Sequence, residues 1–254
     1  MSEEIYLKSN VPVFEAIYGE GFISLGGEVA TLKMFKHEEV ANNTLLDIGF
    51  GIGGMAHLLA SKFNSRVLGV EVHSWMPDYA RETAPKLQKS QFDFATYTTS
   101  GEIPFLDGSV DLAYSKGVLT NVKDKRSLFK EVNRLLKSNG KICLIDWLVP
   151  ASKGPMSETL PMGDASHKET ESTYKYLLQQ AGFSEIYFED VSEEYLGYVR
   201  NLDEKLRSRD HQEQYTNIIN DNLRIQLIES NQILMASIEN GQQLSVKIKA
   251  NKSE

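Results

Sequence analysis

Short apolar runs and helix-period segments alternate along most of this chain. From residue 44 onward, each run rich in β-branched, leucine and aromatic side chains is followed by a segment whose apolar positions recur every three or four residues. The predicted strands are 44–49, 66–72, 92–98, 110–115, 141–149, 184–191 and 244–251. The predicted helices are 53–63, 75–88, 124–137 and 169–181, and Asn139-Gly140 is the stop signal that follows the third. This alternation predicts an α/β fold with a doubly wound, mostly parallel seven-stranded sheet.

The alternation is interrupted between residues 193 and 240 by a polar, helix-favouring stretch without proline. A helical block inserted before the last strand is placed to cover the carboxyl edge of the sheet, where ligands of open α/β sheets bind. The block fits a lid over the site, and an oligomerisation arm is the alternative. The chain is predicted to be one domain with four parts: N-terminal helices (1–40), a Rossmann-like core (41–191), a helical cap (192–241) and the last strand (242–254).

Charge and composition narrow the class of partner. The 254 residues include 35 acids and 27 bases, which gives a net charge of -8. Such a field repels nucleic-acid backbones and anionic lipid surfaces, so a small-molecule partner is expected, without nucleic acid or membrane. The single cysteine, Cys143, lies in an apolar run, and the acidic start of the chain is unlike a signal peptide. A cytoplasmic protein is expected.

The stretch "LLDIGFGIGG" at 45–54 is the main candidate for ligand chemistry. Glycines at 49, 51 and 54 match the spacing of dinucleotide-binding loops. Asp47, two residues before the first glycine, argues against that cofactor, because an unpaired carboxylate in a buried strand is costly. The arrangement resembles motif I of the class I methyltransferases, which bind S-adenosylmethionine.

That resemblance implies roles for several residues. Gly49, Gly51 and Gly53 would let the backbone approach the amino-acid end of the cofactor, and Asp47 would lie near its ammonium group or fix the loop through a water. It also implies the Rossmann-like fold of that superfamily. No cluster of side chains has the ligand spacing of a metal site, so no metal is expected.

Other predicted cofactor residues follow the second, third and fourth strands. Glu71 ends the second strand, where a carboxylate can accept hydrogen bonds from both ribose hydroxyls, each contributing about 1.5 to 3 kcal/mol. Dinucleotide enzymes use an acid there as well. The resemblance implies that Val72 packs on the adenine of the cofactor and that Lys116 lies beside the methionine portion of the cofactor. Where the superfamily places an acid near the adenine amino group, this chain has Thr98, Thr99 and Ser100.

The N-terminal stretch "FEAIYGEGFISLGGEVAT" at 14–31 carries a more specific resemblance. It is similar to the phosphoethanolamine N-methyltransferases, and the similarity extends over nearly the whole chain. The resemblance implies that this segment closes over the cofactor, with Ile23 and Ser24 touching it. Tyr6 matches a family tyrosine that covers the site and belongs to the catalytic pair, and Phe14 stands where the family has a tyrosine.

The residues at the positions that bind substrate in that family differ in this chain. Gly117 and Asn121 stand where the family has an aspartate and the histidine of the catalytic pair. The loop after the fifth strand lacks the tyrosines and arginines that hold phosphate in the family. Asp146 and Trp147 end the fifth strand, and the resemblance implies that they line the acceptor pocket; core packing is the alternative for Trp147. His167 lies in the following loop and is a further candidate base.

The predicted function is transfer of a methyl group from S-adenosylmethionine to a small molecule, with nitrogen as the acceptor that the resemblance implies. Carbon or oxygen acceptors are alternatives. A protein that binds S-adenosylmethionine without catalysis is the rival, because Gly117 and Asn121 replace family residues. The sequence leaves the oligomeric state open.

Overall fold

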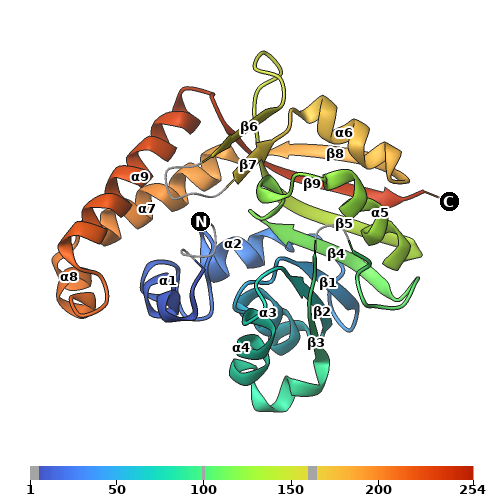
Figure 1. Ribbon diagram of the computed structural model, residues 1–254, viewed down its shortest axis with the longest axis horizontal. Coiled ribbons are helices and arrows are strands. Elements are labelled where there is room, and N and C mark those ends of the chain that lie inside the picture. Colours follow the sequence, from blue (N-terminus) through green and yellow to red (C-terminus); the bar gives the residue numbers. More distant parts are fainter. Residues whose placement is uncertain (1–5, 99–100, 160–164, 254) are drawn as a thin grey trace.

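A seven-stranded sheet forms the centre of the computed structural model, which describes residues 6–98, 101–159 and 165–253 (Figure 1). The sheet order is β3-β2-β1-β4-β5-β9-β8. Its strands are β1 (Thr44–Ile48), β2 (Arg66–Glu71), β3 (Phe92–Thr96), β4 (Val110–Lys116), β5 (Leu136–Leu148), β8 (Phe183–Asp190) and β9 (Leu244–Lys252). The strands β1 to β5 pair in parallel, and β9 runs antiparallel to both β5 and β8. The predicted mostly parallel sheet is confirmed.

Helices connect the parallel strands, and local signals fix several of their ends. The Asp124 side chain accepts from the Ser127 N–H at 3.0 Å and so caps the start of α5. Pro85 follows α4 closely, and the extended residue before it cannot continue a helix, so α4 ends earlier than predicted. The helices are α1 (Val11–Tyr18), α2 (Gly27–Met34), α3 (Gly54–Phe63), α4 (Met76–Thr83), α5 (Lys125–Leu135), α6 (Glu171–Gln180), α7 (Ser192–Arg207), α8 (Arg209–Tyr215) and α9 (Asp221–Glu239). Short 3-10 helices are η2 (Lys8–Asn10), η3 (Lys86–Gln91) and η4 (Leu119–Asn121).

Both faces of the sheet are buried. Along β5, Ile142 and Leu144 pack on the face covered by α5 and α6. Cys143 and Ile145 point to the opposite face, where α2, α3 and α7 contribute side chains to the core. Because successive strand residues alternate between faces, a strand buried on both sides reads as a continuous apolar run. The carboxyl ends of the parallel strands are thereby held in one row.

The predicted end of the third core helix is wrong. The helix α5 ends at Leu135 and β5 begins at Leu136, so Asn139 and Gly140 lie inside the strand. The pairing with β4 shifts register after Leu136, which leaves the residues up to Lys141 as an irregularity at the start of the strand. The pairing of Leu136 with Val110 of β4 therefore ends the helix before its predicted end, and the Asn-Gly pair lies in the irregularity that follows.

The loop after β5 contains an antiparallel hairpin that the sequence pattern did not predict. Its strands are β6 (Met156–Thr159) and β7 (Ala165–Lys168). The hairpin is tied to the core because the buried Lys125 Nζ donates to the His167 carbonyl at 2.5 Å and the Val149 N–H donates to the Glu169 carbonyl at 3.0 Å.

The helices α7, α8 and α9 occupy the predicted cap range and project from the sheet on the side of α1 (Figure 1). The helices α7 and α9 lie side by side and are joined by an ion pair of 2.7 Å between Arg200 and Glu239. A separate apolar cluster connects this block to α1. Its buried members are Ala16, Ile17, Leu202, Leu206 and Ile219. Within the described ranges, no helix combines the length and apolar character needed to cross a membrane.

Candidate active site

Asp47 lies near the carboxyl end of β1, in the buried middle of the sheet. It is 2% exposed, and its Oδ2 accepts a hydrogen bond of 2.8 Å from the Tyr114 hydroxyl on β4. Burial raises the pKa of Asp47 to about 7, against the opposing effects of Tyr114 and Lys116. A carboxylate that is so poorly solvated is stabilised by a nearby cation, so Asp47 is suited to face a ligand ammonium group.

The glycines after β1 allow the N-terminal segment to pack on the loop that they form. A Cβ atom on Gly51 would lie 2.4 Å from Cδ1 of Ile23, and one on Gly54 would lie 2.1 Å from the carbonyl oxygen of Gly21. The loop needs left-handed backbone as well, since φ is 76° at Gly49, 59° at Gly51 and 95° at Gly53. The spacing of the glycines predicts only close approach of a cofactor, and this packing role depends on a tertiary contact.

Glu71 closes the same loop from the end of β2. Its Oε2 accepts from the Gly51 N–H at 3.1 Å and its Oε1 accepts from the Val72 N–H at 2.7 Å. Its Oε1 also accepts from the His73 N–H at 3.4 Å, so the remaining acceptor capacity of the carboxylate for a ligand hydroxyl lies mainly on Oε2. The residue therefore fixes the glycine loop and faces the cavity at the same time.

Lys116 joins the end of β4 to the N-terminal segment. It is 5% exposed, and its Nζ donates to the carbonyl oxygen of Leu25 at 2.9 Å. Burial lowers the pKa of Lys116 to about 7, although the charge of Asp47 acts in the opposite direction. The ammonium group gains from any additional negative partner, such as a ligand carboxylate.

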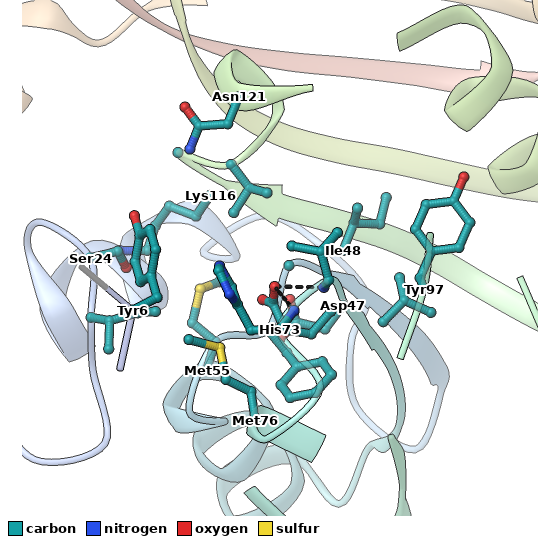
Figure 2. Close-up of a pocket in the computed structure, with 18 of the residues that line it drawn as sticks. Tyr6, Ser24, Asp47, Ile48, Met55, His73, Met76, Tyr97, Lys116 and Asn121 are labelled. Carbon is teal, nitrogen blue, oxygen red and sulfur yellow. Dashed lines mark hydrogen bonds between the residues drawn. The ribbon is translucent and has the colours of Figure 1, made fainter. Parts of the chain in front are cut away.

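These residues enclose a cavity of about 310 Å³, within the size range of small-molecule sites. Figure 2 shows Tyr6 and Ser24 on one side of it, Asn121 above it, and Met55 and Met76 below it. Ten residues predicted from the sequence line the cavity: Tyr6, Ile23, Ser24, Asp47, Gly49, Glu71, Val72, Lys116, Gly117 and Asn121.

Three predicted cofactor residues lie behind the cavity wall. The ring of Phe14 stacks on Tyr6 with 5.9 Å between centroids, so Phe14 supports a lining residue without being one. Gly51 and Gly53 shape the loop and do not line the cavity. Their predicted contact with a cofactor stays a prediction.

On the predicted adenine side, Thr98 is exposed and does not line the cavity. Thr99 and Ser100 lie outside the described residues. Tyr97, the neighbour of Thr98, does line the cavity and is 6% exposed. The signal for Tyr97 was available, because it lies at the carboxyl end of the predicted strand 92–98, at the ligand-binding edge of the sheet.

Met55, Met76 and His73 also line the cavity and were not among the predicted site residues. Met55 and Met76 lie on helices and follow the apolar period of those helices, which made them indistinguishable from core residues. His73 follows Glu71 closely, and its ring lies 5.0 Å from that of Tyr6. The proximity of His73 and Tyr6 depends on a tertiary contact that no local pattern reveals.

Asp146 and Trp147, expected at the acceptor, do not line the cavity. Asp146 is 1% exposed, and its Oδ1 accepts from the backbone N–H of Thr120 at 2.9 Å and from its hydroxyl at 2.8 Å. It therefore holds, from behind, the turn that carries Asn121. Trp147 packs edge-on against Tyr195, with ring centroids 5.7 Å apart. Their predicted contact with a substrate stays a prediction.

The three predicted catalytic residues do not meet at one place. Tyr6 and Asn121 line the same cavity, whereas His167 lies on β7 away from it. The Nδ1 atom of His167 is 2.9 Å from the hydroxyl of Ser157 across the hairpin. Burial and the charges of Lys125 and Lys123 lower the pKa of His167. Among the described residues, no group of three His, Cys, Asp or Glu side chains is placed to hold a metal ion.

A family of methyltransferase domains matches residues 46–144. The chain is 30% identical over 228 residues to phosphoethanolamine N-methyltransferase 1 of Arabidopsis thaliana, covering 84% of this chain and 45% of that protein. It is 28% identical over 149 residues to the sarcosine/dimethylglycine N-methyltransferase of Halorhodospira halochloris, covering 58% of this chain and 53% of that protein. The chain thus spans about half the length of these relatives.

A solved structure of phosphoethanolamine N-methyltransferase 2 from Haemonchus contortus, in complex with phosphomonomethylethanolamine and S-adenosylhomocysteine, has the same fold. The TM-score is 0.86 at 23% sequence identity, over 99% of this chain and 60% of that one. The sheet order, the matched domain and this structure agree on the class of fold.

Proposed function

We propose that this protein transfers a methyl group from S-adenosylmethionine to a nitrogen atom of a small molecule. The chain has the class I methyltransferase fold and resembles the phosphoethanolamine N-methyltransferases. The observation that carries the proposal is the meeting of Asp47, Glu71 and Lys116 around one cavity. Each of these charges matches one polar group of the cofactor.

The residues present fit the cofactor. S-adenosylmethionine, when bound, supplies a methyl group on a positively charged sulfur. A nucleophile attacks the methyl carbon, and the sulfur is the leaving group. Asp47 would accept from its ammonium group, Glu71 from its ribose hydroxyls, and Lys116 would pair with its carboxylate. The two acids and the lysine are buried, so each of these hydrogen bonds forms where water competes little.

The N-terminal segment and the helical block support the exclusion of water. Tyr6, Ile23 and Ser24 line the cavity from a segment that Lys116 ties to β4. The helix α1 in this segment packs on the helical block, which gives α7 to α9 the role of a cap that holds the N-terminal cover in place. A dry and oriented site is the main requirement of methyl transfer, since orientation supplies about 7 to 11 kcal/mol.

A nitrogen acceptor is supported by the relatives, two of which are named as N-methyltransferases of amines. Asn121 offers an amide to this acceptor where the phosphoethanolamine N-methyltransferases have a histidine. A general base contributes typically 10²–10⁴-fold, or about 3 to 5 kcal/mol, which is less than orientation supplies. An amine that reaches the site already neutral therefore suits this pocket.

Gly117 widens the acceptor side of the cavity. A Cβ atom added there would meet no other atom within 4 Å. The space is open where the family carries an aspartate side chain. We therefore expect the acceptor to extend past Gly117 toward Asn121.

Transfer of a labelled methyl group to a panel of acceptors tests the proposal. The panel contains phosphoethanolamine, sarcosine, dimethylglycine and longer amines, with phenols and carboxylic acids as other classes. Label on an amine supports the proposal, and label only on a phenol, acid or carbon atom replaces nitrogen by another acceptor atom. Binding of S-adenosylhomocysteine without transfer to any compound favours a non-catalytic binding protein.

A matched pair of variants checks that the cavity is the site. Glu71→Gln is expected to weaken binding of S-adenosylhomocysteine by about 10- to 100-fold, since one charge-assisted acceptor is lost. Glu102→Gln changes an exposed glutamate and should bind as the unmodified protein does. Equal affinity of both variants in calorimetry would show that the cofactor binds elsewhere.

A further inference from the structure

Three basic side chains of the helical block converge on the carboxyl end of α1. Lys205 of α7 donates to the Ala16 carbonyl at 2.9 Å, and the Nε2 atom of His211 on α8 lies 3.1 Å from the same oxygen. Arg224 of α9 contacts the other ring nitrogen of His211, with 3.0 Å between its Nη1 and Nδ1. The last carbonyls of a helix lack partners within the helix and carry partial negative charge, so donors are stabilising there.

The partners of His211 determine its charge state. The Ala16 carbonyl can only accept, so Nε2 must carry the proton of that contact. The Arg224 guanidinium can only donate, so Nδ1 must present its lone pair. The ring therefore has to be neutral for both contacts to exist.

Protonation of His211 would break this arrangement. A proton on Nδ1 would point at an N–H group of Arg224 and place a new charge beside two existing ones. His211 and Arg224 are 4% and 6% exposed, so water screens this repulsion poorly. Burial and the charges of Lys205 and Arg224 lower the pKa of His211, and the Ala16 carbonyl acts in the opposite direction.

The surroundings of His211 contain no described compensating acid. The charged groups that face it are Lys205 from α7 and Arg224 from α9. The helix α1 offers the Ala16 carbonyl, and from its own helix the Tyr215 ring lies 4.7 Å away. Arg224 is itself held by the carbonyl of Leu206 at 2.9 Å, so it cannot easily turn aside.

The helix α1 is connected to the cavity at two points. Phe14 stacks on Tyr6, which lines the cavity. The Oε1 atom of Glu15 accepts from the Gly21 N–H at 2.9 Å and holds the loop that contributes Ile23. Displacement of α1 would therefore move two parts of the cavity wall.

We propose that His211 and Arg224 are positioning residues that hold α1 over the cavity only while His211 is neutral, so that acid releases the N-terminal cover. The identity of the ligand in the cavity rests on the proposed function. The contact between the helical block and α1 does not depend on that function. The two can therefore be tested separately.

Hydrogen exchange provides the test, with His211→Gln as the matched variant. A glutamine can donate its amide N–H to Ala16 and accept from Arg224, and it has no proton to gain. In the unmodified protein without ligand, the protection factor of 11–18 should fall about tenfold between pH 7.5 and 5.5, relative to α5 as an internal reference. In His211→Gln the protection should stay constant over this range.

A second variant and a second readout complete the design. Arg224→Gln should lower protection of 11–18 at both pH values, while α5 stays protected. Binding of S-adenosylhomocysteine should weaken with acid more steeply in the unmodified protein than in His211→Gln. Equal pH dependence of protection in the unmodified protein and in His211→Gln, or no pH dependence in either, would overturn the proposal. Failure to bind S-adenosylhomocysteine at pH 7.5, with the exchange result intact, would instead contradict the proposed function alone.

Discussion

Asp47 shows at the residue scale that a side chain of the proposed cofactor site is buried at a cost to the unliganded protein. The side chain is buried beside Glu71, and its described hydrogen bond is donated by Tyr114. The folded protein keeps it protonated up to about pH 7, whereas an unfolded aspartate loses its proton near pH 4. Between these values the folded state binds the extra proton, so this residue makes stability fall as pH rises from about 4 to about 7.

Asp47→Asn should therefore stabilise the unliganded protein and damage its site. The amide keeps an acceptor for Tyr114 and removes the buried charge, so we expect a gain of up to about 4 kcal/mol in the free energy of unfolding at pH 8, and little change at pH 4. Binding of S-adenosylhomocysteine should weaken. Urea unfolding at both pH values and calorimetry measure the two effects.

The exposed Asp93 provides the control. Asp93→Asn should change neither the pH profile of stability nor the affinity. A profile of Asp47→Asn that follows that of the unmodified protein would show that Asp47 is ionised in the folded state.

Among the elements, the start of α3 shows that the glycine loop accommodates protein as well as ligand. Gly54 contacts the backbone of Gly21, which cannot yield as a flexible side chain can. The close approach allows the segment before α2 to cover the loop after β1. The glycine loop and the segment before α2 are thus packed directly against each other.

Gly54→Ala should separate the loop from its cover. The added Cβ would lie 2.1 Å from the Gly21 oxygen, so the segment 21–24 must shift. We expect the affinity for S-adenosylhomocysteine to fall at least about tenfold and hydrogen exchange of 21–24 to accelerate. Gly197→Ala in α7, where the new Cβ meets nothing within 4 Å, should instead stabilise by up to about 1 kcal/mol. Similar effects of the two alanines would contradict a specific clash.

The turn between β4 and α5 depends on Asp146. Asp146→Ala leaves the buried N–H groups of Thr120 and Trp147 without their acceptor, which should lower the free energy of unfolding by about 1 to 3 kcal/mol or more. Asp146→Asn retains an acceptor oxygen and should recover most of that loss in urea unfolding. If the alanine variant is as stable as the unmodified protein, the turn does not depend on Asp146.

The strands and helices of the core were predictable because their apolar periods are local. The same holds for Asp47 and Glu71, which end parallel strands and must meet at one edge of the sheet. The end of α5 was not predictable, because it depends on the pairing of Leu136 with Val110 of β4, which no local rule reveals. The hairpin β6-β7 lacks a clear alternation and depends on the contact of Lys125 with His167.

Within the site, the arrangement of the predicted residues around the cavity depends on contacts in space that the sequence pattern does not reveal. Phe14 and Tyr6 were both expected at the cofactor, but only the fold shows that the first supports the second. Asp146 ends a strand at the ligand edge, which made it a candidate for substrate contact, and the fold places it behind a turn. Periodicity shows which strand ends meet and leaves open which side chain faces the cavity.

At the scale of the whole molecule, the net charge of -8 predicts which polymers the protein avoids. We expect no binding of single- or double-stranded DNA oligonucleotides in fluorescence anisotropy at 50 mM salt, a condition that strengthens phosphate contacts. Binding that falls steeply between about 50 and 200 mM salt would reveal a basic surface and contradict the prediction.

The order of the strands also affects how the protein folds while it is being synthesised. The strand β8 joins the sheet only through β9, and the three helices of the cap lie between them in the chain. During translation, β8 is therefore synthesised before its only partner strand, and its backbone N–H and C=O groups stay unpaired until the cap and β9 have been synthesised. Until β9 arrives, both β5 and β8 expose edges that invite pairing with other chains. Slow translation or arrest within the cap therefore prolongs the time during which the edges of β5 and β8 are both unpaired.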